Sequence, residues 1–263
     1  MSSNGGSNVE TRLDQRRGGL VAVVTVNNPS RLNSMNSALM DEFIEAFLSL
    51  AANAELRAVV LTGAGAKAFI GGADIREMSA LTGAEDGRRF ITRLHRCCDR
   101  PRACNRPDQR IDVGGRPGNC RCLRRAHRSG KRGFGMPEVK LGIPSVIEAA
   151  LLPMLIGWGR TRQILLFGEN FTAQEAHSWG LVNELVSGGD LDNAVGRWLD
   201  QLLSCSPGAI RLQKQLIRSW EDMPLRAAIQ AGVESFTTVV RSGEPSAAMH
   251  DFLDRQKLRE TKS

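Results

Sequence analysis

The sequence predicts an α/β protein with a helical C-terminal region. Two apolar, β-branched segments, residues 20–27 and 57–63, have the length and composition of strands and flank an amphipathic helical segment. From about residue 191 onward the pattern is almost entirely that of amphipathic helices. A strand, a helix and a second strand at this spacing indicate a right-handed parallel crossover, the repeating unit of α/β folds.

Each element follows from its own pattern. LVAVVTVN, residues 20–27, is bounded by Gly and Asn-Pro, and RAVVLTG, residues 57–63, is apolar enough to be buried on both faces. TAQEAHSWGLVNELV, residues 172–186, predicts a helix, a glycine stop and a short strand. The helix expected at residues 36–52 places one apolar stripe on a single face, formed by Leu39, Met40, Phe43, Ile44, Phe47 and Leu48.

With 263 residues, 41% of them hydrophobic, the chain is long enough for one large core. We expect a flexible segment at residues 1–19, an α/β core at 20–190 and a helical region at 191–263. The first residues lack the apolar stretch of a signal peptide, and no window approaches the ~18 apolar residues of a membrane span. These features predict a soluble, cytoplasmic protein with no membrane partner.

The net charge of +7 is concentrated in one basic island, residues 96–132. The island holds eleven Arg and one Lys against three Asp, whereas the other 226 residues carry 23 basic and 25 acidic groups. Five of the six cysteines also lie in it: Cys97, Cys98, Cys104, Cys120 and Cys122. Outside the island the protein is nearly neutral, so its overall charge is not by itself a sign of a polyanionic partner.

GAGAKAFIGGADIREM, residues 63–78, is the most informative segment. A dinucleotide-binding fingerprint would open directly into a helix, but here the glycines are followed by an extended segment and a Gly71-Gly72 turn. We expect this turn to let the backbone approach a ligand, with residues 73–75 opening the next helix, where free amides stabilise negative charge. The alternative is a plain glycine turn between a strand and a helix.

Four segments in this order resemble the crotonase superfamily, the enoyl-CoA hydratases and isomerases: NNPSRLNSMNSALMDEF, RAVVLTGAGAKAFIGGADIREM, FGMPEVKLGIP and TAQEAHSWGLVNELV. The resemblance implies stacked ββα units in a spiral, closed by C-terminal helices at residues 191–263 that form a homotrimer or homohexamer. It implies acyl-CoA thioester substrates, with no cofactor besides the coenzyme A that the substrate carries, and no metal.

The resemblance also implies site residues. The thioester oxygen, enolate-like in the transition state, would bind two backbone amides, the first of them that of Ala73. Glu138, in the Phe-Gly-Met-Pro-Glu segment, would be one of two catalytic glutamates that hold a water molecule. Substrate-binding residues would be Ser30, Arg31 and Leu32 at the nucleotide end and Gly71, Asp74, Ile75 and Arg76 along the CoA channel.

The second glutamate of such enzymes follows a glycine-rich turn that supplies the other amide, twenty residues before Glu138, where this chain has Gly118. With suitable third bases, codons for PGNCRCLRRAHRSGKRG, residues 117–133, read one base later as LEIAAACDVRIAPENA, which is typical of the superfamily at this place. We interpret residues 113–133 as frame-displaced, through a sequencing error or a real lesion. Zinc binding is disfavoured by the cysteine spacing, and a nucleic-acid arm by the absence of aromatic residues from the island.

A further departure is GIPSVIEAALLP, where many relatives have a glycine-rich helix start. Glu148 is either a solvated helix residue or an additional carboxylate at the substrate pocket, which would change how water is held and favour a reaction other than simple hydration.

Two hypotheses for the function of the chain therefore stand. The chain is an enoyl-CoA hydratase or isomerase type of enzyme, or it is a catalytically disabled relative that binds CoA or joins an oligomer.

Overall fold

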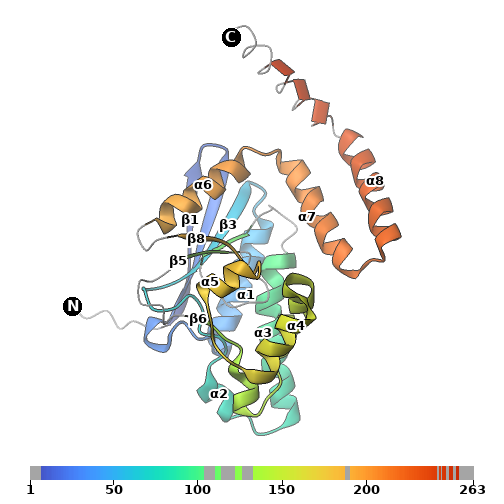
Figure 1. Ribbon diagram of the computed structural model, residues 1–263. Coiled ribbons are helices and arrows are strands. Elements are labelled where there is room, and N and C mark those ends of the chain that lie inside the picture. The colour runs from blue at the N-terminus through green and yellow to red at the C-terminus, as the bar shows by residue number, and fades with distance from the viewer. Residues whose placement is uncertain are drawn as a thin grey trace, which may run out of the picture.

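A computed structural model gives the structure of the protein (Figure 1). It describes residues 7–103, 110–113, 122–125, 133–186 and 190–241, and then residues 243, 245–246, 249–250 and 253–254. All structural statements below refer to these residues.

A six-stranded sheet forms the centre of the molecule, in the order β1-β2-β3-β4-β5-β8. Only β1 and β2 pair antiparallel, and the remaining neighbours are parallel. The strands are β1 (Asn8–Arg16), β2 (Gly19–Asn27), β3 (Leu56–Gly63), β4 (Arg110–Val113), β5 (Cys122–Arg125) and β8 (Val182–Val186). A small antiparallel pair joins β6 (Gly133–Phe134) to β7 (Phe171–Thr172).

Helices cover the sheet and form the C-terminal region (Figure 1). The α-helices are α1 (Ser37–Ala52), α2 (Ile75–Ser79), α3 (Ala84–Ala103), α4 (Leu152–Phe167), α5 (Ala173–Ser178), α6 (Leu191–Leu203), α7 (Pro207–Asp222) and α8 (Leu225–Arg241). Three 3₁₀ turns, η1 (Pro29–Arg31), η2 (Pro137–Leu141) and η3 (Ile147–Leu151), lie in the connections.

The predicted parallel crossover is confirmed, because β2 and β3 pair in parallel and α1 connects them. Asn36 caps α1 by accepting a hydrogen bond from the Leu39 amide at 2.9 Å. The expected stripe is right except at its end, where Leu48 is 48% exposed and Leu50 is buried instead.

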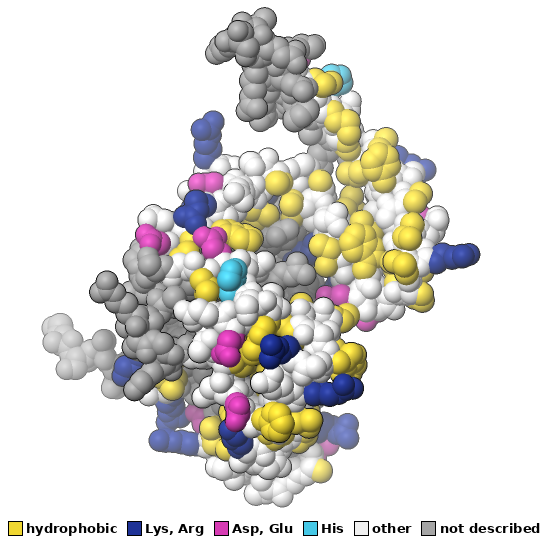
Figure 2. Space-filling model, viewed as in Figure 1, with side chains coloured by type: hydrophobic (Ala, Val, Ile, Leu, Met, Phe, Trp, Pro, Cys, Tyr) yellow, Lys and Arg dark blue, Asp and Glu magenta, His cyan; other side chains and the backbone are white. Residues whose placement is uncertain are grey.

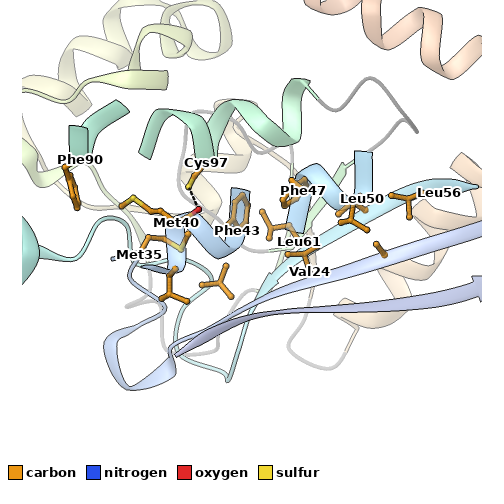
Figure 3. Packing of buried hydrophobic residues seen from close by; sticks show 14 residues of the cluster. Val24, Met35, Met40, Phe43, Phe47, Leu50, Leu56, Leu61, Phe90 and Cys97 are labelled. Atoms are coloured by element: carbon orange, nitrogen blue, oxygen red, sulfur yellow. Dashed lines mark hydrogen bonds between the residues drawn. The ribbon is translucent and has the colours of Figure 1, made fainter. Parts of the chain in front are cut away.

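The two faces of β3 belong to two different cores, as its continuous apolar sequence predicts. Val59 and Leu61 pack with α1 and α3 in the cluster of Figure 3, whereas Ala58 and Val60 pack against α6. Alternation along the strand therefore places each residue in one of two apolar layers. β3 is fixed from both sides, and so is the loop that leaves its C-terminal end.

One expectation about the N-terminus is wrong. Residues 8–16, assigned to a flexible segment, form strand β1 and pair along their whole length with β2. The strand has few apolar residues and exposes most of its side chains, so it lacks the alternating signal of a buried strand. Its order comes from backbone pairing through a tight turn, where Gly18 and Gly19 adopt φ of 113° and 135°.

The C-terminal helices α7 and α8 pack on each other and extend away from the sheet (Figure 1). Figure 2 shows apolar side chains gathered on this arm, and α8 exposes Leu225, Ile229, Val233, Phe236 and Val240. Helices expected from residue 191 onward are present among the described residues as α6, α7 and α8. No helix in the described part of the chain is long and apolar enough to cross a membrane.

The basic island contributes backbone to the sheet. Strands β4 and β5 are interior strands of the six-stranded sheet, and α6 packs against both. Arg124 and Arg125 are residues of β5, whereas Arg121, Arg128 and Gly118 lie outside the described residues. An interior parallel strand beneath a helix is normally rich in Val, Ile and Leu, so the sequence CLRR is foreign to its position.

This conflict predicts low stability. A variant carrying LEIAAACDVRIAPENA at residues 117–132 should melt at least about 5 °C higher than the chain itself, because an interior strand beneath a helix favours a sequence with fewer charged residues than CLRR, and each kcal/mol of stability shifts the melting temperature by roughly 2–4 °C. Calorimetry of both proteins measures the difference, with Arg88→Gln on the exposed part of α3 as a control for charge alone. Equal melting temperatures would contradict the frame-displaced interpretation.

Candidate active site

A cavity of about 270 Å³ lies where the loop after β3 meets α2, α3, η2 and η3. Its wall is mostly apolar and includes Phe69, Met78, Phe90, Leu94, Met136 and Ile143. Two carboxylates, Glu138 and Glu148, and two thiols, Cys97 and Cys98, are the ionisable side chains among the described residues that line it. Such a pocket suits an apolar ligand that presents a few polar atoms.

The backbone around Ala73 is held in a fixed position at the edge of this cavity. The Met35 amide donates to the Gly72 carbonyl at 2.7 Å, and the Asp74 amide donates to the Met35 carbonyl at 2.9 Å. In a parallel bridge the middle residue directs its own N–H away from the partner strand. No described residue accepts a hydrogen bond from the Ala73 N–H, so this donor is left for a ligand.

The glycine turn before Ala73 is required by its local backbone geometry. A Cβ atom on Gly71 would lie 2.7 Å from the Leu32 carbonyl oxygen, and Gly72 has a φ of 100°. Gly71 therefore permits a close approach to the loop after β2, and Gly72 supplies a left-handed conformation. Both residues still line the cavity.

Asp74 acts beside the cavity rather than in it. Its buried carboxylate caps α2 by accepting from the Arg76 amide at 2.9 Å and also binds Arg31 Nη1 at 3.1 Å. Burial alone raises the pKa of Asp74, but the hydrogen bonds from the Arg76 amide and the Arg31 guanidinium outweigh it and hold the pKa below its usual value. Asp74 thereby joins the loop after β2 to α2.

The residues expected at the nucleotide end lie outside the cavity wall. Ser30, Arg31 and Leu32 are exposed on η1 and the residue after it, and Arg76 is exposed on α2. Ile75, also expected to bind substrate, does line the cavity and is 61% exposed. The exposed residues Ser30, Arg31, Leu32 and Arg76 are called the rim below, and Arg31 pairs with Asp74, the residue that follows Ala73.

Glu138 reaches the cavity from η2 and is half-buried. Ser145 donates its hydroxyl to Glu138 Oε2 at 3.0 Å, and the Ile143 amide donates to the Glu138 carbonyl at 3.1 Å. The β6–β7 pair anchors the segment before η2, where Phe134 stacks on Phe171 with ring centroids 5.5 Å apart. The turn is therefore built around a packed aromatic pair, which fixes the carboxylate.

Glu148 also lines the cavity and is 8% exposed, so of the two alternatives for this residue the solvated helix position is wrong. His95 Nδ1 lies 3.2 Å from its Oε1. The preceding residue, Ile147, has a φ of 62°, which for a β-branched residue costs about 1–3 kcal/mol. The packing of η3 maintains this strained backbone and turns Glu148 inward.

Cys97 is buried in the same wall and donates its thiol to the Met40 carbonyl at 3.4 Å. Burial, with a smaller contribution from the Asp41 carboxylate, raises the pKa of Cys97 to about 12. The thiol is therefore protonated at neutral pH and packs as an apolar group rather than acting as a nucleophile.

Sequence reasoning did not identify Asn33 or His95. Asn33 is fully buried with a φ of 56°, and its side chain bonds the Asn28 amide and the carbonyls of Ala64 and Ala68. The left-handed preference of Asn after an Asn-Pro turn is the local signal for such a role. His95 has no local signal, because its partner Glu148 comes from a distant part of the chain.

The lowered pKa of Asp74 predicts a pH-dependent effect of Asp74→Asn. The variant should be about 1–2 kcal/mol less stable at pH 7, since it loses a charged cap and the Arg31 pair. The carboxylate stabilises the fold above the unfolded pKa of ~3.9 and loses this effect as pH falls through the lower folded pKa, so the difference should shrink below about pH 4.

Urea unfolding of the chain and of Asp74→Asn at pH 7 and near pH 3 measures this change, with Asp200→Asn on the exposed face of α6 as the control. A stability difference that persists unchanged at the lower pH would show that the Asp74 charge contributes nothing.

The model of the enoyl-CoA hydratase/isomerase family matches residues 16–94 and 124–261. A short-chain-enoyl-CoA hydratase from Clostridium acetobutylicum is 32% identical over 91% of this chain and 94% of its own length. A crotonyl-CoA hydratase from Syntrophomonas wolfei is 28% identical over 90% of this chain and 93% of its own length. These similarities cover nearly the whole molecule.

The crystal structure of an enoyl-CoA hydratase from Bacillus anthracis superposes with a TM-score of 0.82 at 24% identity, and the match covers 93% of this chain and 96% of the other. This likeness confirms the predicted α/β fold of the crotonase type. The chain is thus a member of the enoyl-CoA hydratase/isomerase family, as its four motifs predict.

Proposed function

We propose that the protein acts on acyl-CoA thioesters, with Ala73 N–H as an oxyanion donor and Glu138 as an acid/base group. The observation that carries the proposal is one apolar cavity lined by both a carboxylate and a backbone N–H that has no acceptor among the described residues. A fixed N–H donor stabilises charge that develops on a thioester oxygen, and a neighbouring carboxylate moves the proton.

In hydration of a 2-enoyl thioester, Glu138 takes a proton from water while the water oxygen bonds to C3. The π electrons of the C2–C3 double bond form a C1–C2 double bond and those of the carbonyl move onto the thioester oxygen, where the Ala73 N–H stabilises the enolate. When the carbonyl forms again, C2 takes up a proton. Ser145, which donates to Glu138 Oε2, holds the carboxylate in place for this exchange.

The cavity wall and its rim suit the two ends of such a substrate. The side chains of Phe69, Met78 and Phe90 provide an apolar surface for an acyl chain. Gly71, Asp74, Ile75 and Arg76 would border the CoA channel, and Ser30, Arg31 and Leu32 would contact the nucleotide end, where the Arg31 guanidinium suits phosphates. The reaction proposed requires no cofactor beyond the coenzyme A of the substrate.

Exposed apolar side chains on α8 support a homotrimer or homohexamer built through residues 191–263. We also propose that the enzyme is cytoplasmic.

A second candidate is a catalytically disabled family member that binds CoA or joins an oligomer. Two observations favour it: the position of the other glutamate carries Gly118, and the family model leaves out residues 95–123. A chain of this kind would retain acyl-CoA binding at the rim and cavity but would lack one acid/base group and one oxyanion donor.

Glu138→Gln separates catalysis from binding. Because the amide keeps the size and polarity of the carboxylate but exchanges no proton, turnover of crotonyl-CoA should fall by ~100-fold or more. Calorimetric affinity for butyryl-CoA should change little. Glu45→Gln, on the exposed face of α1, is the matched control. Weakened binding with intact turnover would make Glu138 a structural turn residue.

The frame-displaced interpretation predicts a gain of activity. The variant with LEIAAACDVRIAPENA at residues 117–132 places Glu at position 118 and should hydrate crotonyl-CoA at least about tenfold faster than the chain itself, since a positioned acid/base group contributes ~100-fold or more. Steady-state rates of the two purified proteins decide the matter. Equal rates would mean that the island, as it stands, does not impair catalysis.

A further inference from the structure

Glu148 is a buried carboxylate for which the proposed mechanism has no role. It comes from η3, ten residues after Glu138, and its side chain is 9% exposed. A buried carboxylate without a structural task is costly, and the strained Ile147 backbone adds to that cost. Such an arrangement indicates a functional group.

The two oxygens of Glu148 have different surroundings. Oε1 lies 3.2 Å from His95 Nδ1, whereas Oε2 has no hydrogen-bond donor among the described residues. Within the described part of the chain, an unpartnered oxygen of a buried carboxylate thus lines the same cavity as Glu138 and the Ala73 N–H.

His95 connects Glu148 to solvent. Its ring comes from α3 and its side chain is 58% exposed, while Nδ1 contacts the buried Glu148 oxygen. Imidazole carries protons readily near neutral pH because its two nitrogens bind and release a proton at opposite ends of the ring. The pair therefore joins a buried oxygen to bulk water through one side chain.

We propose that Glu148 is a catalytic residue that exchanges the C2 proton of the substrate, and that His95 is a positioning residue that returns protons to it. The inference rests on the proposed acyl-CoA function and supplies its missing second acid, since the chain has Gly118 at the other glutamate position.

The proton count closes over one hydration. Glu138 receives a proton from water as the C3–O bond forms, and protonated Glu148 gives its proton to C2 as the enolate electron pair forms the C2–H bond. Glu148 is then re-protonated by an imidazolium at His95, which recovers its proton from solvent, and Glu138 releases its proton to solvent. Water is added across the double bond and both carboxyl groups return to their starting states.

Hydrogen exchange at C2 of a saturated thioester tests the proposed role of Glu148. Butyryl-CoA has no double bond, so in D₂O the C2 hydrogen exchanges only through removal to an enolate and return, with no water added at C3. Mass spectrometry should detect deuterium uptake with the chain itself and with the control Glu45→Gln. Glu148→Gln should lower the exchange rate by ~100-fold or more.

Binding of butyryl-CoA, measured by calorimetry on each protein, distinguishes two kinds of failure. A chain that binds no butyryl-CoA overturns the proposed function and the inference with it. A chain that binds but exchanges equally well after Glu148→Gln, or binds without exchanging at all, overturns the role of Glu148 and leaves the acyl-CoA function standing. If Glu148→Gln does not fold, Glu148→Asp replaces it, and unchanged exchange in that variant likewise counts against the proposal.

His95→Ala should lower the exchange rate by roughly tenfold or more, and imidazole added to the buffer should restore part of it, because a small base can occupy the vacated route. A purely structural histidine would give no such rescue. Exchange that is unaffected by His95→Ala, or lowered without rescue, overturns the proton-return role.

Discussion

The site depends on the hydrogen bonds of one buried side-chain amide, that of Asn33. Asn33 Oδ1 accepts from the Asn28 amide at 2.8 Å, while Nδ2 donates to the carbonyls of Ala64 and Ala68, both at 2.9 Å. These bonds join the loop after β2 to the loop after β3, and they satisfy backbone groups for which the sheet has no partners. The segment that leads to Ala73 starts from this junction, so its position follows from Asn33.

Met35 connects the Asn33 junction to the Ala73 segment. Two residues after Asn33, Met35 is 3% exposed in the main core and makes the two backbone bonds on either side of Ala73. The side chain of Met35 packs with α1 and α3, which fixes its backbone, and its backbone in turn fixes the oxyanion donor. Preorganisation of this kind requires no rearrangement when charge develops on a bound oxygen. Close glycine contacts at Gly63 and Gly71 serve the same junction.

How far the sequence predicts this structure depends on the range of each interaction. The helix start at α2 and the β2–α1–β3 crossover are encoded by local motifs and periodicity and were predicted from them, whereas Glu138 was assigned to the site only through the family resemblance. Strand β1 was missed because antiparallel pairing, not apolar alternation, orders it. Pairs such as His95 with Glu148 join residues 53 apart in sequence, and no local pattern announces them. The same limit applies to Leu50, whose burial is decided by tertiary packing at the end of α1.

The cavity wall consists of residues that match the family model and of residues that do not. The family model matches the chain through the Ala73 segment and through η2 and η3, but the match is interrupted from residue 95, within α3, to residue 123. His95, Cys97 and Cys98 follow at once and still line or adjoin the cavity. Ala73 and Glu138 therefore lie in the matched part of the chain, whereas His95, the partner of Glu148, lies just beyond residue 94. Helix α3 packs on α1 through Phe90 and Cys97, in the same core that holds Met35 beside Ala73. The unmatched part of the cavity wall is therefore supported by the same core as the matched part, and His95 is held as firmly for catalysis as the Ala73 segment.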